Sequence, residues 1–113
     1  MKVGELAKAT GASVRSLHYY EEQGVLRSRR LPNGYREYDA SAIEQVKLIR
    51  KFLTLGLTLE DFRLLAPCFE RQEQGEPPCA SARIRYREKL AEIDERIADL
   101  QALRARVEQR LQL

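Results

Sequence analysis

Residues 3–26, VGELAKATGASVRSLHYYEEQGVL, decide the fold, because two short helical patterns flank the stretch TGAS. The first pattern has its apolar residues on one face, and Gly11 follows it as a helix end. Ser13 has the side chain of an N-cap, so the sequence predicts a second helix over residues 14–23. Two short helices joined by such a turn form a helix-turn-helix, whose second helix docks in the major groove of DNA.

The second helix carries an unusual group of side chains for a short helix, with Arg15, His18, Tyr19 and Tyr20 within two turns. Two adjacent tyrosines beside a cation fill a core poorly but suit contacts with a phosphate backbone. The segment RSRR at residues 27–30 is the sharpest local excess of positive charge. A basic segment beside aromatic residues favours a polyanionic partner. On composition alone, a solvated charged loop is an equal alternative.

A two-stranded hairpin is expected next, over residues 25–38. Residues 32–34, Pro-Asn-Gly, are a turn signal, and residues 35–38, YREY, alternate as a strand does. The hairpin would form a wing attached to the helix-turn-helix.

Two further helices are expected after the wing. Asp39 is the predicted N-cap of a third helix, whose apolar residues recur at helical spacing until Gly56. Thr58 is the predicted N-cap of a fourth helix, with Asp61 completing a capping box. Pro67 is expected to end this helix or to follow its end closely.

The remainder of the chain divides into a linker, residues 67–80, and a long helix, residues 81–113, after a DNA-binding domain at residues 1–66. From residue 81 onward there is no proline or glycine, and apolar residues recur at spacings of four and three, interrupted at Arg104. The residues of this heptad stripe are Tyr86, Leu90, Ile93, Ile97, Leu100, Val107 and Leu111.

A helix of about 30 residues is about 45 Å long, too long for a 66-residue domain to cover its apolar stripe. The stripe therefore predicts a partner, most simply the same helix of a second copy in a symmetric dimer. The alternative is that the helix folds back onto its own head.

Composition limits the class of protein. The chain has 113 residues, 43% hydrophobic and 33% charged, which suits one modest core with a heavily charged surface. No apolar run is long enough to span a membrane, and the N-terminus lacks the apolar middle of a signal peptide, so we expect a cytoplasmic location. The two cysteines are too few for a disulfide-built scaffold and fit reduced thiols.

The order of these motifs resembles the MerR family of bacterial transcription regulators. The resemblance is carried by VGELAKATGASVRSLHYYEEQGVL, by NGYREY at residues 33–38 and by LIRKFLTLGLTLEDFRLL at residues 48–65. It covers residues 3–65, with the coiled-coil tail following where the family has it. The combination is far more specific than any single motif.

The resemblance implies a mainly α fold, in which a winged helix-turn-helix head precedes a long dimerisation helix. The homodimer would be joined by an antiparallel coiled coil and would bind a pseudo-palindromic promoter with an over-long spacer. Members of the family bend and untwist this spacer so that RNA polymerase engages both promoter elements, which is indirect readout used as a switch. Polymerase would thus be an indirect partner, reached through the DNA.

The resemblance also implies roles for individual residues. The DNA contacts would come from the recognition helix and the wing. Those of the helix are Arg15, His18, Tyr19 and Tyr20, and those of the wing are Arg29, Arg30, Asn33, Tyr35 and Arg36. One of the paired tyrosines is expected to be structural, and Tyr38 is expected to pack against the third helix.

Two positions depart from the family pattern. His18 stands where the family usually has arginine, and histidine is shorter and mostly neutral at pH 7. Leu53 replaces a common arginine, so a contact with the DNA backbone is expected to be absent unless Arg50 or Lys51 substitutes.

Cys68 and Cys79 allow three interpretations. They could be structural, they could be a thiol switch that repositions the linker, or they could bind a soft metal with help from a partner subunit. Cys79 lies near the first metal-ligand position of metal-sensing members, but the chain stops where their second ligand loop would begin.

An enzyme is not expected, because the chain lacks a Cys-x-x-Cys pair, a catalytic histidine-carboxylate group and a phosphate-binding glycine loop. No cofactor is expected either. The alternative within DNA binding is an architectural, excisionase-like winged-helix protein that senses no effector. The long dimer helix favours the regulator.

Overall fold

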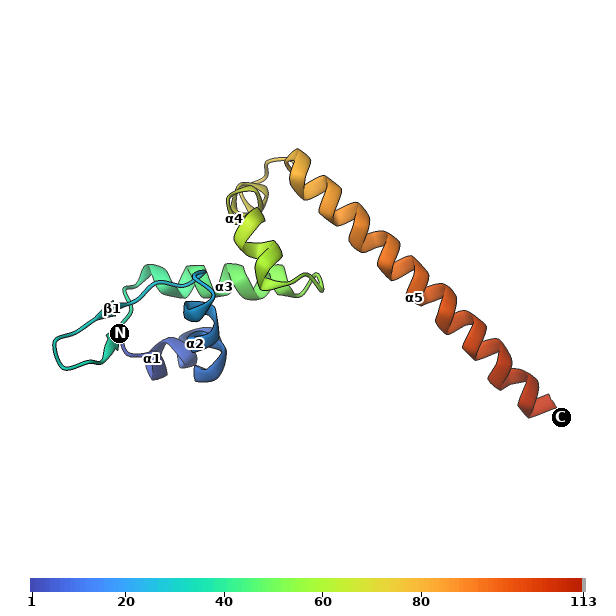
Figure 1. Ribbon diagram of the computed structural model, residues 1–113, viewed down its shortest axis with the longest axis horizontal. Helices are drawn as coiled ribbons and strands as arrows, with labels where there is room; N and C mark the ends of the chain where they lie inside the picture. Colours follow the sequence, from blue (N-terminus) through green and yellow to red (C-terminus); the bar gives the residue numbers. More distant parts are fainter. Residues whose placement is uncertain (113) are drawn as a thin grey trace. The chain divides into compact units, whose positions relative to one another are not determined.

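The computed structural model describes residues 1–112, and these residues form a mainly helical fold with a small hairpin (Figure 1). The elements in chain order are α1 (Val3–Thr10), α2 (Val14–Glu22), β1 (Arg29–Arg30), β2 (Arg36–Glu37), α3 (Ser41–Leu53), α4 (Leu59–Glu73) and α5 (Ala80–Gln112). The chain divides into two units, Met1–Pro77, which we call the head, and Pro78–Leu113, which contains α5. Leu113, the last residue of the expected dimer segment, lies outside the described residues.

Both expected ends of the turn between α1 and α2 are confirmed. Gly11 is left-handed, with φ 76°, and its N–H donates to the Ala7 carbonyl at 2.8 Å. A side chain at this glycine would also meet the guanidinium of Arg50, because an added Cβ would lie 2.9 Å from Nη1. Ser13 caps α2, since its Oγ accepts the Ser16 N–H at 3.0 Å.

The core of the head lies where α1, α2, α3 and α4 pack together. Phe52 of α3 is fully buried, with its ring centroid 5.4 Å from that of Phe62 and 5.1 Å from that of Phe69, both in edge-to-face arrangements. Leu6 of α1 and Leu17 of α2 are also fully buried. The amphipathic patterns read from the sequence thus converge on one apolar centre.

Pro67 does not end α4, contrary to the expectation. The helix continues through this proline to Glu73, so Cys68 lies inside the helix. Proline removes one backbone donor and normally kinks or breaks a helix. The turn beyond Pro67 carries Phe69, which is 5% exposed and packs against Phe52, and this burial offsets the loss.

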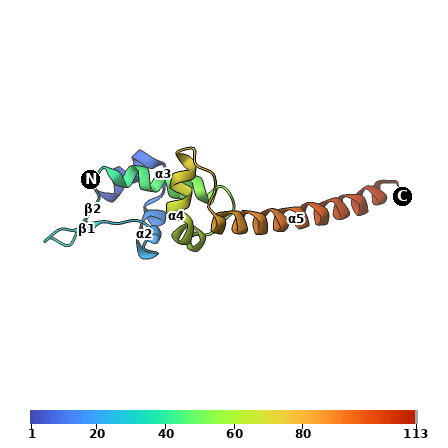
Figure 2. The same ribbon diagram turned by 90° about the horizontal axis from the view of Figure 1, so that it is seen from above.

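The wing is confirmed as an antiparallel hairpin, but it is shorter than expected. β1 pairs with β2 with Arg29 opposite Glu37 and Arg30 opposite Arg36. Val25 does not belong to a strand, because its N–H donates back to the Tyr20 carbonyl at the end of α2, at 3.0 Å. In both views the hairpin projects from the helices of the head (Figures 1 and 2).

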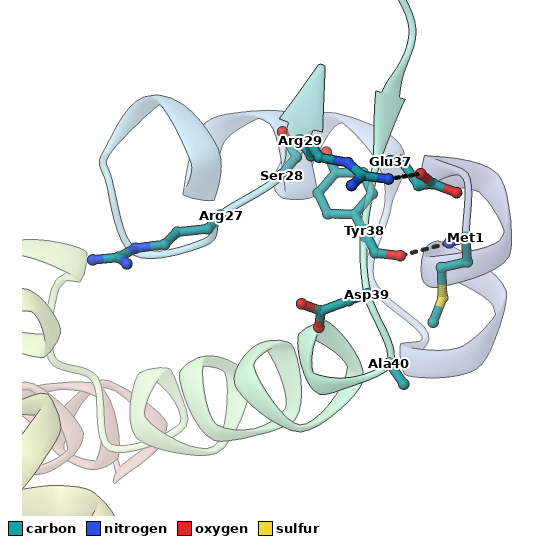
Figure 3. Close-up of a pocket in the computed structure, with 8 residues that line it drawn as sticks. All are labelled: Met1, Arg27, Ser28, Arg29, Glu37, Tyr38, Asp39 and Ala40. Atoms are coloured by element: carbon teal, nitrogen blue, oxygen red, sulfur yellow. Dashed lines mark hydrogen bonds and ion pairs between the residues drawn. The ribbon is translucent and has the colours of Figure 1, made fainter. Parts of the chain in front are cut away.

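The chain start is tied to the strand that leaves the wing. The Met1 amino group donates to the Tyr38 carbonyl at 2.5 Å, and the Tyr38 N–H donates to the Met1 carbonyl at 2.8 Å (Figure 3). Tyr38 itself is fully buried, and its side chain is among the largest in the core.

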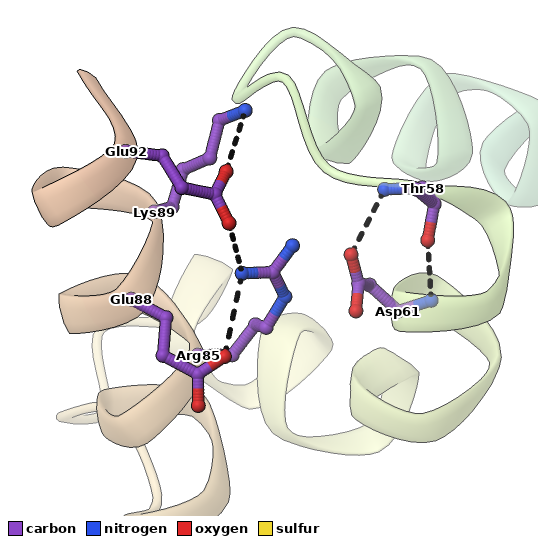
Figure 4. Close-up of polar contacts among 6 residues, drawn as sticks. All are labelled: Thr58, Asp61, Arg85, Glu88, Lys89 and Glu92. Atoms are coloured by element: carbon purple, nitrogen blue, oxygen red, sulfur yellow. Dashed lines mark hydrogen bonds and ion pairs between the residues drawn. The ribbon is translucent and has the colours of Figure 1, made fainter. Parts of the chain in front are cut away.

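The start of α3 differs slightly from the expectation. Ala40, not Asp39, is in the N-cap position and supplies no side-chain bond. Asp39 still caps the helix from one residue earlier, because its Oδ1 accepts the Ser41 N–H at 2.8 Å. Hydrogen bonds from the Ser41 hydroxyl and backbone lower the pKa of the Asp39 carboxyl. The Thr58–Asp61 capping box of α4 is present as predicted (Figure 4).

α5 is one continuous helix of 33 residues, as the absence of proline and glycine predicted. Its turns are linked by ion pairs, in which Arg85 Nη1 lies 3.6 Å from Glu88 and 3.5 Å from Glu92, and Lys89 Nζ lies 3.4 Å from Glu92 (Figure 4). The apolar stripe from Leu90 to Leu111 is 40–85% exposed. Among residues 1–112, no helix is both long and apolar enough to cross a lipid bilayer.

Candidate nucleic-acid interface

The recognition helix α2 presents one face to the core and the opposite face to solvent. Leu17 and Tyr20 are buried, at 0% and 7% exposure. Arg15, His18 and Tyr19 share the opposite face, because positions three and four apart lie on one side of a helix. Arg15 and Tyr19 are exposed there, and His18 is half-buried. These three residues, with Val14 and Glu22, line a depression of about 470 Å³ on α2.

A second concavity, which we call the wing cleft, is formed by α1, α2 and the hairpin. Its volume is about 890 Å³. Its lining residues are Lys2, Val3, Gly4, Glu5, Lys8, His18, Glu22, Arg30, Gly34, Tyr35 and Arg36. Four of these residues are lysine or arginine and two are glutamate, so their net charge is +2 with His18 left out of the sum. A cationic concavity beside an exposed recognition helix suits the backbone of a nucleic acid.

The turn of the wing is built as its sequence predicted. Gly34 has φ 86° and its N–H donates to the Leu31 carbonyl at 2.9 Å. Asn33 Oδ1 accepts the Tyr35 N–H at 3.1 Å, so the amide oxygen holds the turn. Tyr35 is 69% exposed at the side of the wing cleft.

The predicted contact residues are only partly brought together. His18, Arg30, Tyr35 and Arg36 share the wing cleft. Arg29 lines a different pocket, of about 630 Å³, where it forms an ion pair with Glu37 at 3.0 Å (Figure 3). Sheet geometry explains this separation, since neighbouring side chains of a strand point to opposite faces.

The two adjacent tyrosines have different environments, as expected. Tyr19 is 51% exposed, whereas Tyr20 is buried. The inclusion of Tyr20 among the DNA contacts is therefore corrected, because its ring belongs to the core. Tyr38 is also a core residue.

Two lysines of the wing cleft were not identified from the sequence. Lys2 and Lys8 come from the start and the last turn of α1, which the sequence suggested only as a supporting helix. Their spacing of six residues gave no clear sign that both reach the same cleft. The charge-rich stretch MKVGELAK was the available signal.

Arg50 and Lys51, the two possible substitutes for the arginine that is missing at Leu53, both bind groups of the head itself. The Arg50 guanidinium donates to the Thr10 carbonyl at the end of α1, and the Lys51 ammonium pairs with Glu73 of α4. Both cations thus stabilise contacts within the head.

Glu21 and Arg36 connect the recognition helix to the wing. Glu21 Oε2 lies 2.8 Å from Arg36 Nη1, and their side chains are 16% and 31% exposed. The pKa of the nearby Tyr38 hydroxyl is raised, first by burial and then by the negative charge of Glu21. The Arg36 guanidinium acts in the opposite direction and lowers the pKa of the same hydroxyl.

The expectation of reduced thiols does not hold in this structure, because Cys68 and Cys79 are both disulfide-bonded. Arg71 Nη2 lies 3.8 Å from Cys68 Sγ, one turn further along α4. Within residues 1–112, no three histidine, cysteine, aspartate or glutamate residues are grouped to hold a metal ion.

Comparison with known proteins agrees with this geometry. Residues 1–67 match the model of the MerR HTH family regulatory proteins, and residues 43–110 match the model described as MerR, DNA binding. HmrR of Rhizobium leguminosarum bv. viciae, an HTH-type transcriptional regulator, is 33% identical over 96% of this chain and 81% of its own length. CueR of Yersinia pestis, with the same description, is 32% identical over 95% of this chain and 76% of its own length.

A solved structure shows the same fold. The transcription regulator PbrR691 from Ralstonia metallidurans CH34, crystallised with lead(II), superposes with a TM-score of 0.75 at 24% identity. The match covers 96% of this chain and 83% of that one. From the two matching family models and the near full-length similarity to HmrR and CueR, the chain is a member of the MerR family of helix-turn-helix transcription regulators, and not an enzyme.

Proposed function

We propose that this regulator binds a pseudo-palindromic promoter as a homodimer and controls transcription by distorting the spacer between the two polymerase elements. The observation that carries the proposal is the cationic wing cleft beside the face of α2 that carries exposed Arg15 and Tyr19 and half-buried His18. The helix would read base edges while the wing and α1 hold phosphates. RNA polymerase would be affected through the DNA, in the bacterial cytoplasm.

The DNA contacts in this proposal come from two groups. The recognition helix contributes Arg15, His18 and Tyr19. The wing and α1 contribute the phosphate contacts, which come from Arg30, Tyr35, Arg36, Lys2 and Lys8. Asn33 holds the turn of the wing, and Arg29 is a cation outside the wing cleft.

Homodimerisation is proposed from the stripe on α5. Continuous exposed apolar stripes of this length are uncommon on monomers. Each apolar residue of the stripe from Leu90 to Leu111 is at least 40% exposed. Leu103, 54% exposed, continues the stripe beside the polar Arg104 and was not identified from the heptad spacing. The antiparallel pairing of two such helices would place one head at each end.

The operator itself tests the proposal. A footprint on promoter DNA is expected to show two protected half-sites on either side of the spacer, with enhanced cleavage between them where the duplex is deformed. An architectural, excisionase-like role predicts instead scattered or cooperatively spreading protection. That pattern, or protection of a single half-site, would contradict the proposal.

A thiol-reactive or redox signal is proposed as the effector. Two cysteine thiols give up two electrons and two protons to an oxidant, such as a peroxide or another disulfide, when they become a disulfide. Cys68 is half-buried rather than inaccessible, and the Arg71 guanidinium beside its sulfur would favour the reactive thiolate after reduction. The soft-metal alternative has only these two cysteines as thiolate ligands in the chain.

Serine replacement tests the thiol signal. In the native protein, oxidant should change promoter-dependent transcription in vitro several-fold, and a reductant should reverse the change. The double variant Cys68→Ser, Cys79→Ser is expected to bind the promoter as the reduced native protein does and to ignore the oxidant. An oxidant response that persists unchanged in this variant would eliminate the cysteines as the sensor.

A further inference from the structure

The contact between Glu21 and Arg36 joins the two DNA-facing elements of the head. Glu21 belongs to α2 and Arg36 to β2, and their charged atoms lie 2.8 Å apart. Arg36 also lines the wing cleft, where Arg30 and Tyr35 extend along the same hairpin. One guanidinium thus meets a carboxylate of the recognition helix and borders the cationic cleft.

The sequence periods of both elements place these side chains together. Glu21 follows Leu17 by four residues, so it lies on the face of α2 that is turned toward the core. On β2, Arg36 and Glu37 point to opposite faces, and Glu37 pairs with Arg29 across the ladder. Tyr38, two residues after Arg36, is directed inward and is fully buried.

Burial makes this ion pair different from the exposed pairs of the head. The second carboxylate oxygen of Glu21, Oε1, is buried and has no hydrogen-bond partner among residues 1–112. A desolvated carboxylate is held strongly by the one cation beside it, and it becomes unfavourable when that cation is removed. The pKa of the neighbouring Tyr38 hydroxyl is raised, first by burial and then by the charge of Glu21, while Arg36 acts to lower it.

Arginine can hold this carboxylate and a phosphate at the same time. The guanidinium carries five N–H donors in a rigid plane, and the Glu21 contact is made through Nη1. Arg36 remains 31% exposed, so part of the guanidinium stays accessible.

We propose that Glu21 is a positioning residue for DNA binding, which fixes the wing on the recognition helix and holds the Arg36 guanidinium toward a phosphate. This inference rests on the proposed function, because it gives Arg36 a role at the DNA. It also predicts an unusual direction for the effect of a charge removal on DNA affinity. Removing a negative charge from a DNA-binding surface normally strengthens binding, but removing the charge of Glu21 should weaken it.

A double-mutant cycle with a matched control tests the inference. Glu21→Gln is expected to weaken promoter binding about tenfold and to lower the salt dependence of the affinity by about one phosphate contact per subunit. Glu60→Gln, on an exposed carboxylate of α4 that lines neither the wing cleft nor the depression on α2, should leave binding unchanged or tighter. In an Arg36→Ala background, Glu21→Gln should cause no further loss, since the group it positions is gone.

Two results would overturn the inference. One is an affinity of Glu21→Gln equal to or above that of the native protein. The other is an equal loss in the native and Arg36→Ala backgrounds, together with a lowered melting temperature, which would make Glu21 merely structural.

A measurement without DNA separates this inference from the proposed function. If Glu21 holds Arg36, the rate at which phenylglyoxal modifies Arg36 should rise several-fold in Glu21→Gln and stay unchanged in Glu60→Gln. Mass spectrometry of the full chain would measure both rates. An unchanged rate would show that Glu21 does not hold Arg36. If the rate rises but the native protein binds no promoter fragment, the contact is supported and its role in DNA binding fails with the proposed function.

Discussion

Replacing Ile97 with glutamate is expected to produce monomers and to lower the affinity for promoter DNA at least about 100-fold. Ile97 lies at the middle of the α5 stripe and is 48% exposed in the single chain. Burying one isoleucine side chain contributes about 1.5–3 kcal/mol, and a symmetric dimer buries two copies. The added carboxylates would in addition be desolvated at the interface without a cation designed to meet them.

The loss of DNA affinity follows from the loss of the dimer. A monomer holds one half-site only, so the second head no longer binds at the high effective concentration that the coiled coil provides. Sedimentation equilibrium and promoter titration would measure the two effects on the same samples. The head should keep its fold, because its core residues belong to the other unit of the chain.

Ala102→Glu is the matched control for this prediction. Ala102 is exposed on α5, but the heptad places it on the side of the helix away from the stripe. This variant adds the same charge five residues further along and should remain a dimer with nearly native affinity. Equal dimerisation of the Ile97→Glu and Ala102→Glu variants would mean that the interface is elsewhere.

Arg15→Ala is expected to weaken promoter binding about 100-fold without changing the dimer. Arg15 is exposed on the outer face of α2, one turn before His18 and Tyr19. A well-made arginine contact with a base contributes about 1–3 kcal/mol of discrimination, and the dimer makes it twice. Titration of the native and altered half-sites would show whether the loss is concentrated at particular base pairs.

Arg63→Ala provides the control for the charge. Arg63 is exposed on α4 and lines neither of the two α2 concavities. This variant loses the same charge and should bind within about twofold of the native protein, apart from a small general electrostatic effect. A loss in Arg63→Ala as large as that in Arg15→Ala would show that net charge, and not the α2 face, determines affinity. Loss of the dimer in Arg15→Ala would mean that the DNA-binding and dimer surfaces are misassigned.

Local patterns predicted most of the fold, because its signals lie within a few residues of each other. Ser13 and Gly11 limit the helices of the helix-turn-helix, and Thr58 with Asp61 starts α4, all as the sequence indicated. The long helix α5 was equally visible from composition and spacing. The predicted helix end at Pro67 was wrong, because the packing of Phe69 on Phe52 keeps α4 helical beyond the proline.

The site was less predictable than the fold because it joins separate segments. The pattern identified Arg15, His18 and Tyr19, which neighbour one another on α2. It did not show that Lys2 and Lys8 reach the wing cleft, nor that Glu21 meets Arg36, fifteen positions later. Such contacts between distant residues depend on how the wing packs against the helices, and the periodicity of the sequence does not predict that packing.

The most direct test of the account is the stoichiometry of the complex with DNA. Sedimentation equilibrium of the full chain with a promoter duplex at low salt is expected to give two chains on each duplex, and a dimer when the DNA is left out. A chain that is monomeric at working concentration, or that binds no bacterial promoter fragment at low salt, would contradict it.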